Sequence, residues 1–230
     1  MKCENTLSTG FQSLDRVLGG GFHGDSLNVI AARPGMGKSV FALQCAVGMV
    51  KDTDKKIYIF SLEMSRNHAK EKFKELYSRE NILFDDIPAI TPNQIHARLA
   101  GISDLGAVII DYFQLLLPNP CEQNAAANTN KVAGELKVIA REFNIPIICT
   151  SQLPRTLEKR RDRRPLLRDL AKISGGLEQI SDVILFLYRY AYYDTDEING
   201  AEVTVANNRF GRCDVLPFRF EGSIPQFSEE

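Results

Sequence analysis

The sequence predicts an α/β fold with a mainly parallel, twisted sheet that carries helices on both faces. Two observations support this prediction. Short, nearly continuous apolar runs, typical of strands that are buried on both sides, recur along the chain. Segments with helical periodicity separate them, at residues 40–50 and 131–143, where apolar side chains return to one face. Strands that alternate with helices in this way form parallel sheets.

The predicted strands cover residues 26–32, 56–62, 107–110, 145–150, 183–188, 202–206 and 215–220. The last two flank residues 208–212, whose glycine and polar side chains predict an antiparallel hairpin at the edge of the sheet. Residues 118–130 lack periodicity and residues 155–165 are densely charged, so we expect both segments to be loops. No repeat or linker divides the chain, and we expect one domain over residues 1–230.

Composition limits the class of protein. With 230 residues, of which 44% are apolar and 25% charged, the chain can bury the core of one large domain. Its net charge of -1 argues against coating nucleic acid by bulk positive charge, so any such contact must be local. No run approaches the roughly 20 apolar residues of a membrane span, and the start lacks a secretion signal. We therefore expect a soluble, cytoplasmic protein without membrane contact.

Cysteine and histidine usage indicates no metal centre. The five cysteines are far apart and never in Cys-x-x-Cys spacing, which disfavours a disulfide framework and a zinc site. The three histidines also lack the spacing of metal ligands. We expect reduced thiols that mostly fill the core.

Residues 32–39 read Ala-Arg-Pro-Gly-Met-Gly-Lys-Ser and lie directly between a predicted strand and a predicted helix. In this context glycines let backbone amides turn toward a phosphate, and the helix N-terminus adds its positive dipole end. Lys38 would reach the β- and γ-phosphates of ATP, and the Ser39 hydroxyl would bind Mg²⁺. Alanine at 32 replaces the usual glycine, which is tolerable where φ is negative. The residues predicted to bind the nucleotide are Arg33, Pro34, Gly35, Met36, Gly37, Lys38, Ser39 and Asp111.

Polar residues end three further predicted strands. Asp111 follows an apolar run and would hold Mg²⁺ together with Ser39. Glu63 is the candidate general base for the water that attacks the γ-phosphorus, and Gln152 would sense the γ-phosphate. Each also has a structural explanation: Asp111 as a turn starter, Glu63 as a cap for a helix starting near Ser65, and Gln152 as an ordinary polar strand end.

These residues occur in longer motifs. The chain contains Ser-Leu-Glu-Met-Ser at 61–65, Asp-Tyr-x-Gln-Leu at 111–115, Ser-Gln-Leu at 151–153 and Ser-Gly-Gly-Leu-Glu-Gln at 174–179. On these motifs the chain resembles the C-terminal ATPase domain of DnaB-type replicative helicases over nearly its whole length. The resemblance implies a RecA-like P-loop NTPase core that hydrolyses ATP between the subunits of a homo-oligomer, a hexameric ring, while moving on single-stranded DNA in replication. It also suggests a loader or a primase as a partner.

The resemblance assigns a role to Arg209. In the family an arginine finger from a C-terminal hairpin reaches the active site of the neighbouring subunit. There it stabilises charge on the transferring phosphoryl group, which raises the rate by about 10³- to 10⁵-fold. Arg209 matches the finger position, whereas Asn207 stands where the family usually has lysine. Without the family match, Arg209 would be read as a solvated arginine at a hairpin tip.

The resemblance also implies a DNA-binding loop after Asp169-Leu170. Lys172 takes the place of the usual arginine, and the amides of Gly175 and Gly176 would contact the DNA backbone. The preceding basic stretch either adds to the DNA contact or serves subunit contacts; its cations are Arg155, Lys159, Arg160, Arg161, Arg163, Arg164 and Arg168.

Two other functions stay open. One is a nucleotide switch of the RecA or KaiC type that binds ATP and partner proteins without translocating, which the Asn207 substitution and the altered 171–176 loop motivate. The other is a weakly active accessory subunit that assembles with a true helicase. Because the chain starts almost directly at the ATPase motifs, we expect no N-terminal collar domain, as in an excised domain or a compact relative of phage type.

Overall fold

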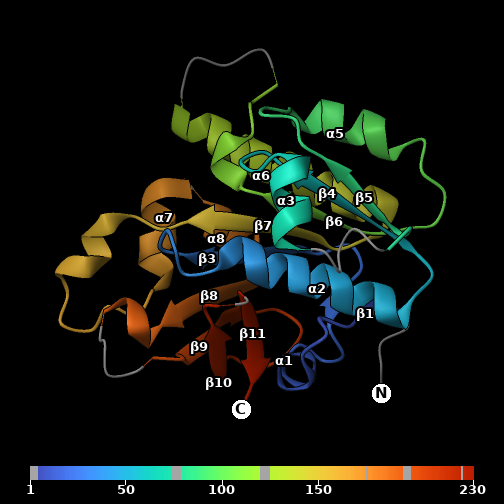
Figure 1. The fold of residues 1–230 in the computed structure, drawn as a ribbon. Coiled ribbons are helices and arrows are strands. Elements are labelled where there is room, and N and C mark those ends of the chain that lie inside the picture. Colours follow the sequence, from blue (N-terminus) through green and yellow to red (C-terminus); the bar gives the residue numbers. More distant parts are fainter. Residues whose placement is uncertain (1–4, 74–78, 120–124, 175, 194–197, 224) are drawn as a thin grey trace.

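Strands form the centre of the molecule. The computed structural model describes residues 5–73, 79–119, 125–174, 176–193, 198–223 and 225–230. The strands are β1 (Thr6–Leu7), β2 (Phe22–His23), β3 (Leu27–Ala32), β4 (Lys56–Ser61), β5 (Ile82–Asp85), β6 (Leu105–Asp111), β7 (Ile147–Gln152), β8 (Val183–Arg189), β9 (Gly200–Asn208), β10 (Asp214–Glu221) and β11 (Gln226–Glu229). Within the described residues, nine of them form one sheet in the order β11-β10-β9-β8-β3-β7-β6-β4-β5 (Figure 1). The remaining pair, β1 and β2, forms a small antiparallel sheet.

The direction of the strands divides the main sheet into two parts. From β8 to β5 all neighbours are parallel, whereas β9, β10 and β11 are antiparallel to the strands beside them. This confirms the predicted mainly parallel sheet with a C-terminal antiparallel hairpin. The β9–β10 hairpin is not at the sheet edge as expected, because β11 pairs with β10 on the outer side. That strand is short and mostly polar, so little in the residues themselves indicates it.

Helices cover both faces of the sheet, as predicted. They are α1 (Gln12–Val17), α2 (Lys38–Asp52), α3 (Arg66–Lys72), α5 (Pro92–Leu99), α6 (Ala125–Phe143), α7 (Leu167–Ser174) and α8 (Leu177–Ile180), with 3-10 turns η1 (Phe113–Leu115), η2 (Arg155–Lys159) and η3 (Tyr190–Tyr192). Side chains of α1, α2 and α3 pack into one core, and those of α5, α6, α7 and α8 into the other. Central β3 contributes to both, with Ile30 in the first core and Val29 and Ala31 in the second.

Two segments expected to be loops are more ordered than predicted. Helix α6 begins at Ala125, inside the segment 118–130, because its alanines are strong helix formers. In the segment 155–165, η2 forms, and two arginines are held by carboxylates. Arg160 pairs with Asp169 at 2.9 Å, and Arg164 with Glu202 at 2.7 Å.

None of the described helices combines the length and the apolar character that a bilayer crossing requires. The longest of them, α6, contains charged residues, among them the exposed Arg141 and Glu142.

An aromatic cluster joins α2 to the antiparallel strands. Phe41, one turn into α2, is fully buried and stacks on Phe11 with ring centroids 5.0 Å apart. It also meets Phe227 of β11 edge-on at 5.2 Å and Phe218 of β10 at 6.0 Å. The start of α2 is therefore fixed by contacts with both the N-terminal segment and the C-terminal strands.

We expect Phe41→Ala to lower the free energy of unfolding by about 3–5 kcal/mol, because it removes a ring that touches three others and leaves a cavity. Urea denaturation followed by circular dichroism measures this, with Phe41→Leu as a control that keeps most of the apolar volume and should lose less. A loss below about 1 kcal/mol for the alanine variant would contradict a structural role for the cluster.

Candidate nucleotide-binding site

Four parallel strands end side by side. The register pairs Ala32 of β3 with Gln152 of β7, and Ser61 of β4 with Asp111 of β6. The segments that follow these strands therefore start at the same edge of the sheet, which is where ligands bind in open α/β sheets. This edge brings together the loop at 33–39, Glu63, Asp111 and Gln152, as the sequence predicted.

The loop after β3 has the conformation that its glycines permit. Gly35 and Gly37 have φ of 78° and 94°, a region that favours glycine. Gly37 is also the N-cap of α2, and a Cβ there would lie 2.9 Å from the ring of Phe227. Ala32 remains in the extended strand and is not among the residues with positive φ, so alanine is accommodated.

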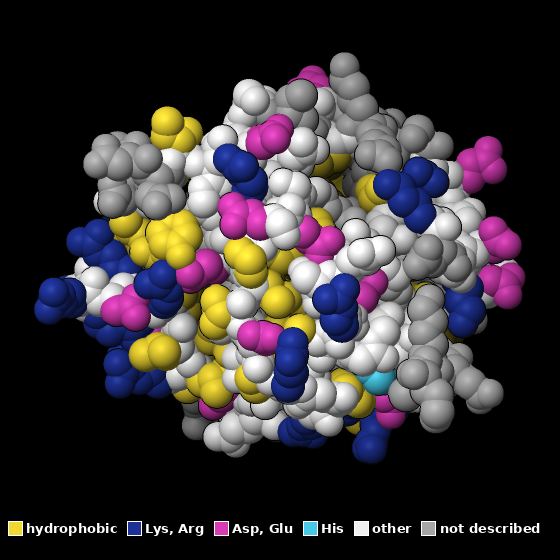
Figure 2. Space-filling model, turned by 90° about the horizontal axis from the view of Figure 1, so that it is seen from below, with side chains coloured by type: hydrophobic (Ala, Val, Ile, Leu, Met, Phe, Trp, Pro, Cys, Tyr) yellow, Lys and Arg dark blue, Asp and Glu magenta, His cyan; other side chains and the backbone are white. Residues whose placement is uncertain are grey.

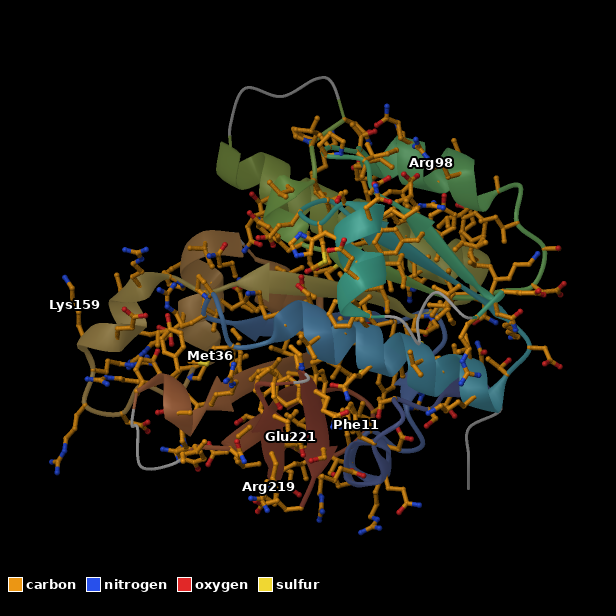
Figure 3. The ribbon with its side chains drawn as sticks, in the orientation of Figure 1. Phe11, Met36, Arg98, Lys159, Arg219 and Glu221 are labelled. Atoms are coloured by element: carbon orange, nitrogen blue, oxygen red, sulfur yellow. The ribbon has the colours of Figure 1, made fainter. Side chains whose placement is uncertain are left out.

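The side chains of the loop point in different directions. Arg33 is buried and turns away toward η2, where it pairs with Glu158 at 2.9 Å and donates to the carbonyl of Leu153 at 2.6 Å. Met36, labelled in Figure 3, is buried in the core under α2. These two residues can therefore contribute only backbone groups to a ligand, whereas Pro34, Lys38 and Ser39 are half-buried and keep part of their surface in solvent.

Charges of opposite sign meet at Lys38. Burial lowers the pKa of its ammonium group, while the carboxylates of Asp111 and Glu63 act in the opposite direction and the guanidinium of Arg33 lowers it further. An ammonium group that has lost part of its hydration interacts strongly with a nearby anion. The position of Lys38, at the first turn of a 15-residue helix, adds the helix dipole to this field.

Asp111 is held in place by a neighbouring strand. Its carboxylate is buried, and Oδ1 accepts a hydrogen bond of 2.5 Å from the hydroxyl of Thr150 on β7. The other carboxylate oxygen and the Ser39 hydroxyl make a small set of oxygen donors, and Mg²⁺ typically takes one or two such protein ligands and completes its shell with phosphates and water. The described residues contain no group of three or more His, Cys, Asp or Glu side chains that could hold a metal alone. The donor set therefore fits Mg²⁺ bound together with a nucleotide.

Glu63 is exposed in a short turn after β4. The Ser61 hydroxyl fixes this turn by donating to the carbonyl of Met64 at 2.7 Å. Ser65 is the N-cap of α3 and its hydroxyl accepts from the amide of His68, so the alternative explanation of Glu63 as the helix cap does not hold. The exposed Glu63 carboxylate is close enough to Lys38 to raise the pKa of that ammonium group.

Gln114 is a residue of this edge to which the sequence assigned no role. Its side chain donates to the hydroxyl of Ser151 at 2.9 Å and to the carbonyl of Gln152 at 3.1 Å, and it accepts from the amide of Gln152 at 3.3 Å. It thus orients the strand end that carries the predicted γ-phosphate sensor. The Asp-Tyr-x-Gln-Leu motif contained it, but spacing alone gave no reason for its function.

Arg189 and Tyr192 pack against the phosphate loop, a contact that the sequence did not predict. The guanidinium of Arg189 donates to the carbonyl of Gly35 at 3.0 Å and lies 3.6 Å from the centre of the Phe220 ring; burial lowers its pKa. Tyr192 is 44% exposed, and its ring edge lies 3.3 Å from where a Cβ on Gly35 would be. Arg189 therefore supports the loop conformation, and Tyr192 offers an aromatic surface next to it.

Arg209 lies near the amino ends of the parallel strands, whereas the phosphate loop follows the carboxyl end of β3. Its amide donates to the carbonyl of Asp182, and the amide of Asp182 donates to the carbonyl of Leu27 at the start of β3. The phosphate loop begins after Ala32 at the other end of this strand, roughly 17 Å away at about 3.3 Å per residue. The Arg209 side chain cannot reach the loop of its own chain.

The residues expected to bind DNA are only partly in a loop. Lys172 is exposed on the last turn of α7, which continues to Ser174, and Gly175 lies outside the described residues. Gly176 is buried, in contrast to the exposed amide that we expected, because α8 starts there and the side chain of Asn130 from α6 packs against it.

The basic stretch is only in part a source of free charge. Arg160 and Arg164 are paired with carboxylates, and Arg163 lies 4.9 Å from the centre of the Tyr193 ring. The exposed cations that form no ion pair with another described residue are Arg155, Lys159, Arg161 and Arg168. Lys159 points away from the body of the protein in Figure 3, and Figure 2 shows Lys and Arg side chains gathered at the same end.

A glycine-containing loop between a parallel strand and a helix, with a buried aspartate at the end of a nearby strand, is typical of nucleotide-binding domains of the P-loop class. The family model described as DnaB-like helicase C terminal domain matches residues 6–74 and 66–229, and the chain belongs to this family.

Known relatives agree with this assignment. The replicative DNA helicase DnaC of Bacillus subtilis is 35% identical over 255 residues, which cover 96% of this chain and 56% of the relative. The replicative DNA helicase DnaB of Geobacillus stearothermophilus is 34% identical, with coverages of 93% and 54%. The chain thus spans about half the length of the curated relatives that it matches.

Solved structures show the same architecture. One of them, an ATPase domain at 30% identity, superposes with a TM-score of 0.89 and covers 100% of this chain and 93% of that one. A DnaB-like replicative helicase, studied with its primase interactions, gives 0.88 at 31% identity, with coverages of 97% and 61%. The RadB recombinase, at 20% identity and a TM-score of 0.64, shares the fold.

We expect Thr150→Val to raise the Mg²⁺ concentration needed for half-maximal binding of a fluorescent ATP analogue by about tenfold, because Asp111 loses the donor that orients it. Titration of Mg²⁺ at fixed analogue measures this. Thr150→Ser keeps the hydroxyl and should behave like the wild type. An unchanged Mg²⁺ dependence for the valine variant would contradict the role of Thr150 in orienting Asp111 for the metal.

Proposed function

We propose that this chain is a motor domain that hydrolyses ATP at the interfaces between copies of itself and thereby moves along single-stranded DNA during DNA replication. The observation that carries the proposal is that Arg209 and the phosphate loop lie at opposite ends of the parallel strands of one sheet. A head-to-tail contact between copies brings these two ends together, and repeated head-to-tail contacts close into a ring. The proposed ring is hexameric.

In the proposed site, backbone amides of the loop and the Lys38 ammonium hold the β- and γ-phosphates of ATP. Ser39 and Asp111 hold Mg²⁺, which neutralises charge on the phosphates. Glu63 accepts a proton from the water whose oxygen attacks the γ-phosphorus, and ADP leaves as the bond to its β-phosphate oxygen breaks. Gln152 senses the γ-phosphate, in an orientation that Gln114 supports.

The neighbouring copy completes this site. Its Arg209 guanidinium stabilises negative charge on the transferring phosphoryl group, so hydrolysis depends on how the two copies are arranged. Conversely, the state of the nucleotide changes that arrangement, and this reciprocity couples ATP turnover to movement of the DNA-binding residues. Lys172, which is exposed at the end of α7, is the proposed contact to DNA phosphates, together with Gly175 on the basis of the sequence.

The relatives suggest partners. One similar structure is described as a DnaB-like replicative helicase with its interactions with primase, which supports a primase as a partner of this chain; a loader is a second candidate. Single-stranded DNA is the proposed polymer because the chain belongs to the DnaB-like helicase family. With a net charge of only -1, its contacts to DNA phosphates must come from a few local cations.

We expect Lys38→Ala to lower ATP hydrolysis stimulated by single-stranded DNA by about 100-fold or more, because the phosphates lose their main cationic contact. Phosphate release at low salt, with and without a single-stranded oligonucleotide, measures this. Lys55→Ala is the matched control and should retain activity, because this exposed lysine lies directly before β4, far from the end of the strand that carries the site. A wild-type rate that single-stranded DNA does not raise would contradict the motor.

A nucleotide switch that does not translocate is the second candidate, favoured by Asn207, whose amide binds the carbonyl of Ser181 instead of offering a charge. Mixing Arg209→Ala with Lys38→Ala chains distinguishes the two. An interface site predicts that about one interface in four pairs an intact loop with an intact finger and regains activity. A switch whose site lies within one chain predicts no recovery, and a weakly active accessory subunit predicts little hydrolysis by either wild-type or mixed chains alone. Arg212→Ala, an exposed arginine on the same hairpin, is the control.

A further inference from the structure

Asp182 is the centre of a charged cluster next to Arg209. Its carboxylate is buried, and one oxygen, Oδ2, accepts from the amide of Leu27 at 2.8 Å and from the ammonium group of Lys137 at 2.7 Å. Lys137 in turn donates to the carbonyl of Asp25 at 2.6 Å. Two donors on a single oxygen, one from the backbone and one from a helix, leave this carboxylate little freedom to rotate.

The other oxygen of the same carboxylate faces Arg209. Oδ1 lies 3.4 Å from Nη1 of Arg209, while Nη2 donates to the carbonyl of Gln179 at 2.8 Å. Arg209 nevertheless stays 53% exposed. The carboxylate of Asp182 and the carbonyl of Gln179 therefore orient the guanidinium, while one side of it remains open to a partner.

The chain on either side of Arg209 is also fixed. The side-chain amide of Asn208 donates to the carbonyls of Val17 and Arg212 at 3.1 and 3.0 Å. The ring of Phe210 stacks on His23 with centroids 4.0 Å apart and planes 10° from parallel. Ordering a segment of chain and a long side chain costs conformational entropy. An arginine that only points into solvent at a hairpin tip would not need these contacts.

We infer that Asp182 is a positioning residue that sets the direction of Arg209 for its action on the neighbouring copy. The inference rests on the proposed function, since it requires that Arg209 act in trans. A carboxylate that is anchored through one oxygen and bound to arginine through the other holds the guanidinium at a defined angle before the copies meet. Loss of that angle impairs the phosphoryl-transfer step and leaves the binding of nucleotide by the chain's own loop unchanged.

The first experiment measures the split between turnover and binding in Asp182→Asn. We expect kcat of DNA-stimulated ATP hydrolysis to fall by about 10- to 100-fold, while the Kd of a fluorescent ATP analogue with Mg²⁺ stays within about twofold. Arg212→Ala is the matched control, because this exposed arginine lies on the same hairpin and pairs with Asp214 rather than with Asp182. It should keep kcat within about threefold of the wild type.

The second experiment asks whether the defect lies at the interface. The Asp182→Asn chain is mixed with the Lys38→Ala chain. The first contributes an intact phosphate loop, and the second contributes an Arg209 that is still positioned by Asp182. Activity should therefore reappear at about one interface in four. A merely structural defect in Asp182→Asn would give no such recovery. If the single variant does not fold, Asp182→Asn combined with Lys137→Met removes both buried charges together, which is the better tolerated change, and the same mixture is tested.

The outcomes separate the two proposals. If Arg209→Ala lowers kcat while Asp182→Asn keeps the kcat of the wild type, the role of Asp182 is overturned and the proposed function remains intact. The same holds for an Asp182→Asn chain that is slow but not restored by Lys38→Ala. Wild-type turnover in Arg209→Ala would overturn both.

Discussion

The common direction of β3, β4, β6 and β7 is the constraint on which the candidate site depends. Because these strands are parallel and in register, the loop at 33–39, Glu63, Asp111 and Gln152 meet at one edge although they lie far apart in the sequence. Side chains of adjacent strands then hold each other, as Thr150 holds Asp111 and Gln114 holds the backbone at Gln152. A triphosphate at this edge would meet groups that are already oriented.

The reversal of direction after β8 has a second consequence. Strand β9 returns antiparallel to β8, so Arg209 emerges at the edge where β3 begins, next to Asp182 and away from the phosphate loop. The same antiparallel strands continue into β10 and β11, whose phenylalanines pack on the first turns of α2. One C-terminal unit thus supports the loop of its own chain and, in the proposed function, also carries the arginine that acts on another. The proposed interface follows from the topology of the sheet rather than from added segments.

Much of this arrangement could be predicted from the sequence. The apolar runs indicated the parallel strands, and the spacing of Gly35, Gly37 and Lys38 indicated the loop, because both patterns are local. The long-range partners could not be predicted. Nothing adjacent to Arg189 indicates that it binds the carbonyl of Gly35, and the role of Asp182 depends on Lys137 and Leu27, which lie in other elements. The expected exposed glycine at 176 is buried for the same reason, since α6 packs against it.

In the proposed function one copy binds the triphosphate and the adjacent copy completes the site. A structure of the assembled chain with Mg²⁺ and a non-hydrolysable ATP analogue would reveal this arrangement. We expect the guanidinium of Arg209 to lie about 3 Å from a γ-phosphate oxygen bound by the loop of the next copy. An analogue enclosed by groups of a single chain, with Arg209 of every copy directed into solvent, would contradict it.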